Sequence, residues 1–243
     1  MIIAHRGESC DAPENTLAAF NLAWERGAKA VECDVHLSKD KKIIVIHDGN
    51  TLRTTDLDKP VAEQTETELK KLDAGKWKNP KWEGATLSTL DEFLDTLPVD
   101  GKLLVEVKCN IEIVPILKEL LTKCKVKTEQ IILMDFNYAT VSEMKKTMRN
   151  YEVLWLSTMR RMKYIPVNTD TLIRKTLFAG LNGLNVLNQS RVNEELVDKV
   201  KSAGLKLYVW TVDDPIEMKR LIDLGVDGIA TNRAKWMKDY LKI

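Results

Sequence analysis

The 243-residue chain has no excess of charge, because 37 basic side chains stand against 36 acidic ones and the net charge is +1. A chain so balanced has no long-range field that would attract nucleic acid or an anionic membrane surface, and we expect neither as a partner. It also lacks an apolar run of about 20 residues, the length that spans a bilayer. We therefore expect no stable insertion into a membrane.

The charged and apolar regions of a secretory leader are also missing, since the chain opens directly on the strand-like stretch that begins at Ile2. We therefore expect a cytoplasmic protein, or a periplasmic or secreted one if a leader has been removed. The oligomeric state is left open.

Cysteine and histidine are scarce, with four and three residues respectively. The cysteines lack the short paired spacing of a zinc site or a small disulfide framework, which favours a structural role. We expect Cys33 and Cys109 to pack beneath a helical layer, because they alternate with acidic strand residues. The histidines, His5, His36 and His47, all lie within the first 47 residues, which confines acid–base chemistry near neutral pH to one region.

Apolar strand-like stretches alternate with helix-like stretches along the chain, which predicts a parallel sheet. Eight such units in about 250 residues favour a TIM (β/α)8 barrel over an open doubly wound sheet. The segment from about 48 to 88 is too long for a plain connection and predicts a small inserted lobe within one domain, 1–243. The strands are predicted at 2–7 and at about 30–36, 102–108, 130–134, 152–156, 183–187, 206–211 and 227–230.

Three carboxylates lie on predicted strands. Glu32 and Asp34 share one face of their strand, and Glu106 shares a face with Lys108 on another, because side chains alternate along a strand. Three hard oxygen ligands without a paired cysteine or histidine suit one divalent cation, Mg²⁺ or Ca²⁺. The alternative is a structural network in which Arg6 or Lys108 neutralises each carboxylate.

Two histidines stand beside charged residues at the ends of apolar stretches: His5 precedes Arg6, and His47 precedes Asp48 after a stretch predicted as a further strand, 43–48. Catalytic groups of a barrel lie at the carboxyl ends of its strands, so these histidines are expected to converge with the carboxylates. Two imidazoles can act as a general acid and base pair, and the cations can balance charge on a phosphoryl group. His36 is expected to border the site in a supporting role.

Several ordered blocks resemble the glycerophosphodiester phosphodiesterase family, and together they cover nearly the whole chain. The agreement of many blocks in one order is far more specific than any single motif. The blocks are His5-Arg6-Gly7, Pro13-Glu14-Asn15-Thr16, Glu32-Cys33-Asp34-Val35, Lys39-Asp40, His47-Asp48, Leu52-Arg53-Thr54-Thr55, Leu69, Leu72-Asp73-Ala74-Gly75, Trp77, Thr89-Leu90-Asp91-Glu92, Glu106-Val107-Lys108, Val209-Trp210-Thr211-Val212 and Asp227-Gly228-Ile229.

The resemblance implies a TIM barrel with a small lobe that hydrolyses glycerophosphodiesters to sn-glycerol 3-phosphate and an alcohol. It also implies that a substrate hydroxyl attacks phosphorus to give a cyclic phosphate, which water then opens. The implied roles are acid and base for His5 and His47, metal ligation for Glu32, Asp34 and Glu106, phosphate binding for Arg6 and Lys108, and a glycerol-pocket wall for Trp210.

The chain departs from the family pattern at three positions. Asp213 stands where asparagine is common, Asp135 where serine is more frequent, and Ser38 where threonine is usual. The two aspartates would either add negative charge at the pocket mouth or cap the helices that follow them.

Three other functions remain open. A related barrel phosphodiesterase could act on lysophospholipids or another phosphodiester, a binding protein could keep the metal site without turnover, and a scaffold would need exposed apolar patches. A lysophospholipid would need an apolar track, and the tryptophans of the lobe are expected to pack back on the barrel instead. The residues considered for the track are Trp77, Trp82, Met159, Met162 and Tyr164.

Overall fold

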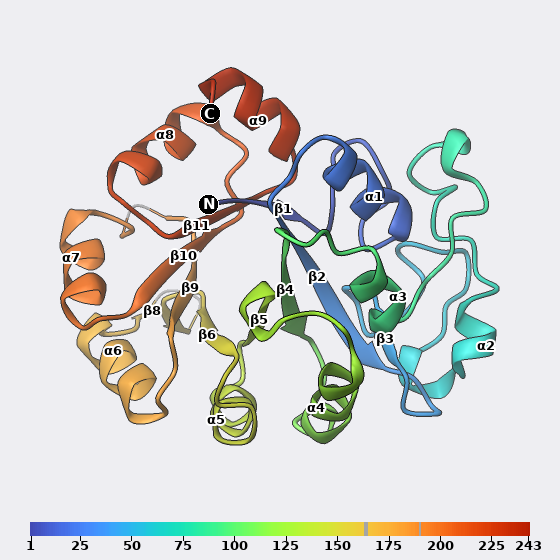
Figure 1. Ribbon diagram of the computed structural model, residues 1–243, viewed down its shortest axis with the longest axis horizontal. Coiled ribbons are helices and arrows are strands. Elements are labelled where there is room, and N and C mark those ends of the chain that lie inside the picture. Colours follow the sequence, from blue (N-terminus) through green and yellow to red (C-terminus); the bar gives the residue numbers. More distant parts are fainter. Residues whose placement is uncertain (163–164, 190) are drawn as a thin grey trace.

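In the computed structural model, which describes residues 1–162, 165–189 and 191–243, eight parallel strands form a closed ring (Figure 1). β1 pairs with both β2 and β11, which closes the barrel. The predicted TIM barrel is confirmed, and each of its eight predicted strands lies within two residues of an observed one. The strands are β1 Ile2–His5, β2 Ala30–Leu37, β4 Lys102–Val107, β5 Ile131–Asp135, β6 Glu152–Ser157, β9 Gly183–Leu187, β10 Lys206–Trp210 and β11 Gly228–Thr231.

Helices cover the outside of this ring (Figure 1). Polar side chains begin several of them: Thr16 accepts a hydrogen bond from the backbone of Ala19, and Asp214 accepts from Ile216 and Glu217. The outer helices are α1 Leu17–Glu25, α3 Leu90–Asp95, α4 Ile113–Lys123, α5 Tyr138–Thr147, α6 Thr169–Phe178, α7 Glu194–Ser202, α8 Pro215–Asp223 and α9 Ala234–Leu241.

Two apolar layers follow from the alternation of side chains along the strands. The outward-facing residues pack beneath the helices, and buried Cys33 belongs to this layer with Cys109 packed against it, as predicted. The inward-facing residues, such as Leu104 and Leu154, fill the barrel interior.

The predicted strand at 43–48 differs from expectation. β3 covers only Ile43–Val45 and runs antiparallel to β2, with Val35 opposite Val45. It therefore lies outside the parallel ring. The reason is the short turn from Ser38 to Lys42, since a parallel partner needs a crossover of a dozen or more residues. This hairpin returns the chain to the level of Asp34, whose backbone oxygen accepts from Ile46.

The inserted lobe is confirmed. It contains the 3-10 helix η1 Val61–Glu63, the short helix α2 Glu66–Leu69 and the 3-10 helix η2 Pro80–Trp82, around a small apolar cluster of its own. The indole N–H of Trp82 donates to the backbone of Asp11, 3.0 Å away, which ties the lobe to the barrel as predicted. The indole of Trp77 donates within the lobe, to Ala74.

Only part of the apolar track considered above falls on side chains that the structure describes. Met159 is 1% exposed and packs beneath the helical layer. Its neighbour Met162 belongs to a small antiparallel hairpin made by β7 Arg160–Met162 and β8 Ile165–Pro166. Tyr164 lies outside the described residues.

Candidate active site

The predicted site residues converge at the carboxyl end of the barrel. They surround a hollow of about 260 Å³, here called the mouth pocket. Seven of the eight line it, and the eighth, fully buried Asp34, lies opposite Glu106 in the strand register. The seven are His5, Arg6, Glu32, His47, Glu106, Lys108 and Trp210.

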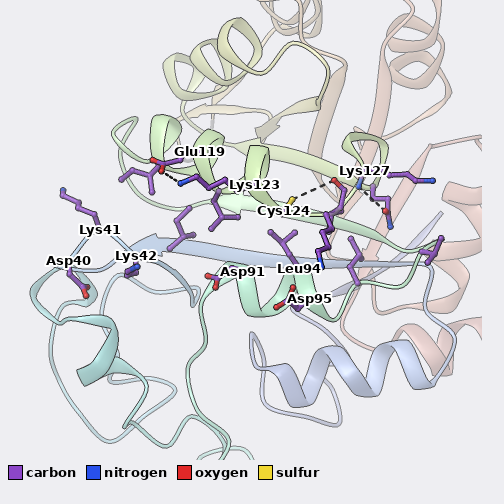
Figure 2. A pocket seen from close by; sticks show the side chains of 18 residues that line it. Asp40, Lys41, Lys42, Asp91, Leu94, Asp95, Glu119, Lys123, Cys124 and Lys127 are labelled. Atoms are coloured by element: carbon purple, nitrogen blue, oxygen red, sulfur yellow. Dashed lines mark hydrogen bonds and ion pairs between the residues drawn. The ribbon is translucent and has the colours of Figure 1, made fainter.

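A larger groove of about 760 Å³ lies on the outside of the barrel, between α3 and α4 (Figure 2). Its polar lining consists mainly of lysines and carboxylates, including the pair Lys123 and Glu119. None of the predicted site residues lines this groove.

The three carboxylates come together beneath the pocket. One ligand atom from each of Glu32, Asp34 and Glu106 lies within 4.8 Å of the others. Two of their oxygens, Oε1 of Glu32 and Oδ1 of Asp34, are buried and accept no hydrogen bond from the described residues. Burial and repulsion from Asp34 raise the pKa of Glu106 to about 7 and that of Glu32 well above its usual range.

Two cations lie on opposite sides of this acidic cluster. Nε of Arg6 lies 3.1 Å from Asp34, and Nζ of Lys108 lies 2.7 Å from Glu106 and 3.7 Å from Asp34. The backbone of Arg6 also donates to Glu32 at 2.9 Å from a left-handed conformation, φ 59°. When all three buried carboxylates are ionised, the two cations leave one negative charge uncompensated, which favours a further cation among them.

Asn15 positions the central carboxylate. Its Nδ2 donates to Oδ2 of Asp34 at 2.8 Å, and its Oδ1 accepts from the Asp34 backbone at 3.2 Å. Asn15 has φ 56°, in the left-handed region that asparagine tolerates better than most residues. Although Asn15 falls within a recognised block, its contact with Asp34 was not foreseen.

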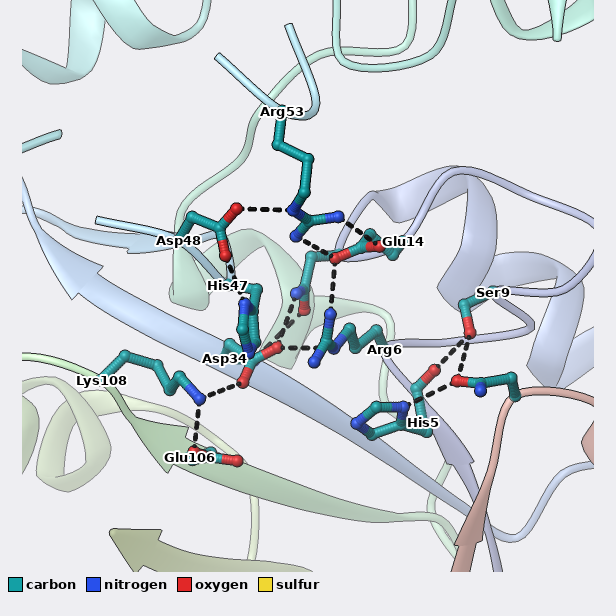
Figure 3. A network of polar contacts seen from close by, with 12 residues as sticks. His5, Arg6, Ser9, Glu14, Asp34, His47, Asp48, Arg53, Glu106 and Lys108 are labelled. Atoms are coloured by element: carbon teal, nitrogen blue, oxygen red, sulfur yellow. Dashed lines mark hydrogen bonds and ion pairs between the residues drawn. The ribbon is translucent and has the colours of Figure 1, made fainter. Parts of the chain in front are cut away.

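A chain of charged side chains holds His47 (Figure 3). Its Nδ1 lies 2.5 Å from Asp48, which also accepts from Nε of Arg53 at 2.5 Å. Arg53 in turn donates two hydrogen bonds to Glu14, which also accepts from Arg6. Although partial burial opposes the change, hydrogen bonds from Arg53 and His47 lower the pKa of Asp48 to about 2.

His5 has a different environment. Its Nδ1 lies 2.7 Å from Oδ1 of Asn232, and its Nε2 lies 3.9 Å from Glu32. Burial and then the charge of Arg6 lower the pKa of His5. The third histidine, His36, lies behind the site, with Nε2 3.1 Å from the backbone oxygen of His47.

The opposite wall of the mouth pocket is apolar. Trp210 meets Phe136 edge to face, with ring centroids 5.7 Å apart, and Nζ of Lys108 lies 5.8 Å from the Phe136 centroid. Phe136 and Asn185, which also line the pocket, are absent from the sequence prediction. Phe136 directly follows β5 at the carboxyl edge of the barrel. Because site residues lie at that edge, this position in the sequence could have identified Phe136 as a candidate for the pocket lining.

The three departures from the family pattern have local partners. Asp135 accepts from the backbone of Asn137, but Asn137 itself caps α5, so Asp135 does not cap the helix as one interpretation expected. Burial raises the pKa of Asp135 to about 6. Ser38 closes the turn between β2 and β3 through the backbone of Lys42. Asp213 neither caps a helix nor stands unpaired, because it binds the loop after β11 at Asn232.

Fold and site together define a barrel enzyme with an acidic mouth that can hold a metal ion. The sequence pattern of the Glycerophosphoryl diester phosphodiesterase family matches residues 5–235, and the chain belongs to this family of enzymes. A glycerophosphodiester phosphodiesterase of Caldanaerobacter subterraneus subsp. tengcongensis is 34% identical over 96% of this chain and 93% of its own. One from Bacillus subtilis is 30% identical over 96% of this chain and 83% of its own.

Solved structures agree with the barrel and its lobe. An Oleispira antarctica phosphodiesterase, in complex with its product sn-glycerol-3-phosphate, superposes with a TM-score of 0.88 at 27% identity, over 100% of this chain and 97% of that one. A Thermotoga maritima glycerophosphodiester phosphodiesterase gives 0.80 at 26% identity, over 98% and 97%. Among the described residues, no helix has the length and apolar content needed to cross a membrane.

Proposed function

We propose that the mouth pocket hydrolyses glycerophosphodiesters to sn-glycerol 3-phosphate and an alcohol, with one bound divalent cation and with His5 and His47 as acid and base. The observation that carries this proposal is the convergence of three carboxylates, two imidazoles and two cations in one pocket. The product found in the Oleispira antarctica relative supports the choice of substrate.

Glu32, Asp34 and Glu106 would hold the cation, Mg²⁺ or Ca²⁺. The two buried carboxylate oxygens without a hydrogen bond fit this role, since hard oxygen atoms are the ligands that both ions prefer. When bound, the cation supplies Lewis-acid stabilisation of charge on a phosphoryl oxygen.

Arg6 and Lys108 would bind the phosphate from two sides, while Trp210 and Phe136 would enclose the glycerol. A pocket of about 260 Å³ suits a glycerol phosphate but not a long acyl chain, which favours a glycerophosphodiester over a lysophospholipid. An open hollow of about 490 Å³ shares His5 and Arg6 with the pocket, and the alcohol part of the substrate would extend into it.

The partners of the two imidazoles suggest how the protons move. Nδ1 of His5 meets the amide oxygen of Asn232, so Nε2 is left to accept the proton of the attacking glycerol hydroxyl. His47, held by the Asp48 carboxylate, would donate a proton to the leaving alkoxide. The hydroxyl oxygen bonds to phosphorus as the ester bond breaks. Water then opens the cyclic phosphate with the two roles reversed.

The test is release of sn-glycerol 3-phosphate from esters with choline, ethanolamine, glycerol and inositol head groups, after EDTA treatment and after Mg²⁺ or Ca²⁺ is restored. We expect metal-dependent release, with kcat lowered about 10²- to 10⁴-fold in each of His5→Ala and His47→Ala. The matched control is His36→Gln, which should lose far less.

A substrate without the adjacent glycerol hydroxyl should be turned over poorly, and equal rates with and without it would contradict the cyclic intermediate. Absence of release with every head group and metal would contradict the proposed function.

A further inference from the structure

The side chain of Asn232 stands between His5 and Asp213, three residues brought together from β1 and from the loops that follow β10 and β11. Oδ1 of Asn232 lies 2.7 Å from Nδ1 of His5, which is 227 positions away in the sequence. Nδ2 of Asn232 donates to Oδ2 of Asp213 at 2.7 Å. Figure 3 shows His5 and its contacts in this part of the site.

Asp213 determines which way the Asn232 amide points. Its Oδ1 accepts from the hydroxyl of Thr231 and from the backbone of Asn232, both at 2.8 Å, and its Oδ2 accepts from the Asn232 amide. A carboxylate only accepts hydrogen bonds, so the amide nitrogen must face Asp213 and the amide oxygen must face His5. The hydroxyl of Ser9 donates to the backbone oxygen of His5 at 2.7 Å and lies 3.3 Å from the amide oxygen of Asn232.

The amide oxygen in turn selects the tautomer of the neutral imidazole. Only a protonated Nδ1 can donate to it, so Nε2 carries the lone pair on the side of Glu32 and the mouth pocket. His47 is oriented differently, because a carboxylate contacts its ring directly.

We propose that Asn232 and Asp213 are positioning residues that hold the ring of His5 and fix its neutral tautomer, so that Nε2 faces the substrate. This inference rests on the proposed function, in which His5 exchanges a proton with the substrate. Neither residue lines the mouth pocket. Both border the adjoining open hollow, but their link to the reacting groups runs through the ring of His5.

The decisive variants exchange the amide and the carboxylate. In Asp213→Asn, the oxygen of the new amide stays with Thr231 and the backbone of Asn232, and its NH₂ group then faces that of Asn232. The Asn232 amide must flip and present NH₂ to His5, which selects the wrong tautomer. Asn232→Asp alone places two carboxylates face to face. In the double exchange, D213N together with N232D, each donor again meets an acceptor.

We expect each single variant to lower kcat about 10- to 100-fold, the usual effect of losing a partner that orients an active group. The substrate KM should change less than about twofold, and the double exchange should recover most of the lost kcat. Asp214→Asn is the matched control, because it removes the same charge one position away and asparagine still caps α8.

The tautomer is measured directly by long-range ¹H–¹⁵N correlation NMR on protein labelled at histidine nitrogens. We expect protonated Nδ1 at His5 in the wild type and protonated Nε2 in Asp213→Asn. An unprotonated Nδ1 in the neutral wild type overturns the proposal, even if no variant folds. Single variants with unchanged kcat would also overturn it. A folded double variant that is no more active than the single variants would do the same. If the wild type hydrolyses no phosphodiester, the proposed function fails, and the NMR result still reports on His5.

Discussion

At the scale of single residues, the site is dominated by the burial of three carboxylates and by the repulsion among them. The raised pKa values of Glu32 and Glu106 mean that the metal-free protein holds these groups against an unfavourable field. The same field makes the cluster a strong attractor for a divalent cation.

Glu32→Gln should therefore separate stability from metal binding. Without metal, the variant should be at least as stable as the wild type, because a neutral amide replaces a buried carboxylate whose ionisation is opposed by burial and by Asp34. The wild type should gain about 2.7 kcal/mol at a metal concentration 100 times Kd, or roughly 5–10 °C in Tm, and the variant should gain almost nothing. Thermal unfolding with EDTA and with added Mg²⁺ or Ca²⁺ measures both. A full metal response in the variant would remove Glu32 from the ligand set.

Glu14 makes an acid-sensitive contribution to folding. Burial opposes ionisation, but Arg53 and Arg6 outweigh it and lower the pKa of Glu14 from 4.5 to about 2. A group with a lowered pKa in the folded state stabilises the protein above its unfolded pKa, and that stability is lost as pH falls from about 4.5 towards 2. The depression corresponds to about 3 kcal/mol at most.

Glu14→Gln should accordingly lose about 2–3 kcal/mol at pH 7 and show a flatter pH dependence below pH 5. Urea unfolding at pH 7 and pH 3 measures the difference. The exposed Asp198 on α7 supplies the control, Asp198→Asn, which should change little at either pH. Equal losses for Glu14→Gln at both pH values would contradict the assigned ion pairs.

At the scale of elements, the β2–β3 hairpin is what brings His47 to the barrel mouth. The barrel ring alone supplies His5 and the carboxylates, whereas His47 follows two residues after β3, which runs antiparallel to β2. Arg53 then joins this hairpin segment to the loop before α1, because its guanidinium contacts both Asp48 and Glu14.

Arg53→Ala should lower kcat about tenfold with a smaller effect on stability, because His47 and Asp48 lose their common anchor while Arg53 is itself 42% exposed. Arg53→Lys should recover only part of the activity, since an ammonium cannot reproduce a bidentate fork. Steady-state kinetics measure both, and the exposed Lys71→Ala in the same lobe is the control. Full activity in Arg53→Ala would show that His47 needs no such anchor.

At the scale of the whole molecule, the prediction of one domain spanning 1–243 stays a prediction. It is supported by three ties between the lobe and the barrel: Trp82 to Asp11, Lys78 to Ser9, and Arg53 to Glu14. We expect a single calorimetric transition whose van't Hoff and calorimetric enthalpies agree. A separate transition of lower temperature, lost on deletion of 48–88, would mean that the lobe unfolds independently.

The sequence by itself determined the barrel, the lobe and the residues that gather at the mouth. Strand and helix periodicities are local properties of the sequence. Because side chains alternate along a strand, the positions of Glu32, Asp34 and Glu106 indicate which face of the strand each one occupies. The antiparallel direction of β3 was also readable, since the turn from Ser38 to Lys42 is too short for a crossover.

Only the tertiary structure decided how those residues are held. Asn232 meets His5 across 227 positions, and Arg53 meets Glu14 across 39. No local pattern encodes such pairings, because a hydrogen bond depends on where closure of the ring places two distant loops. The barrel is specified by a local sequence pattern of strand and helix that repeats along the chain. The tautomer of His5 depends instead on one amide, which a carboxylate distant from His5 in the sequence orients.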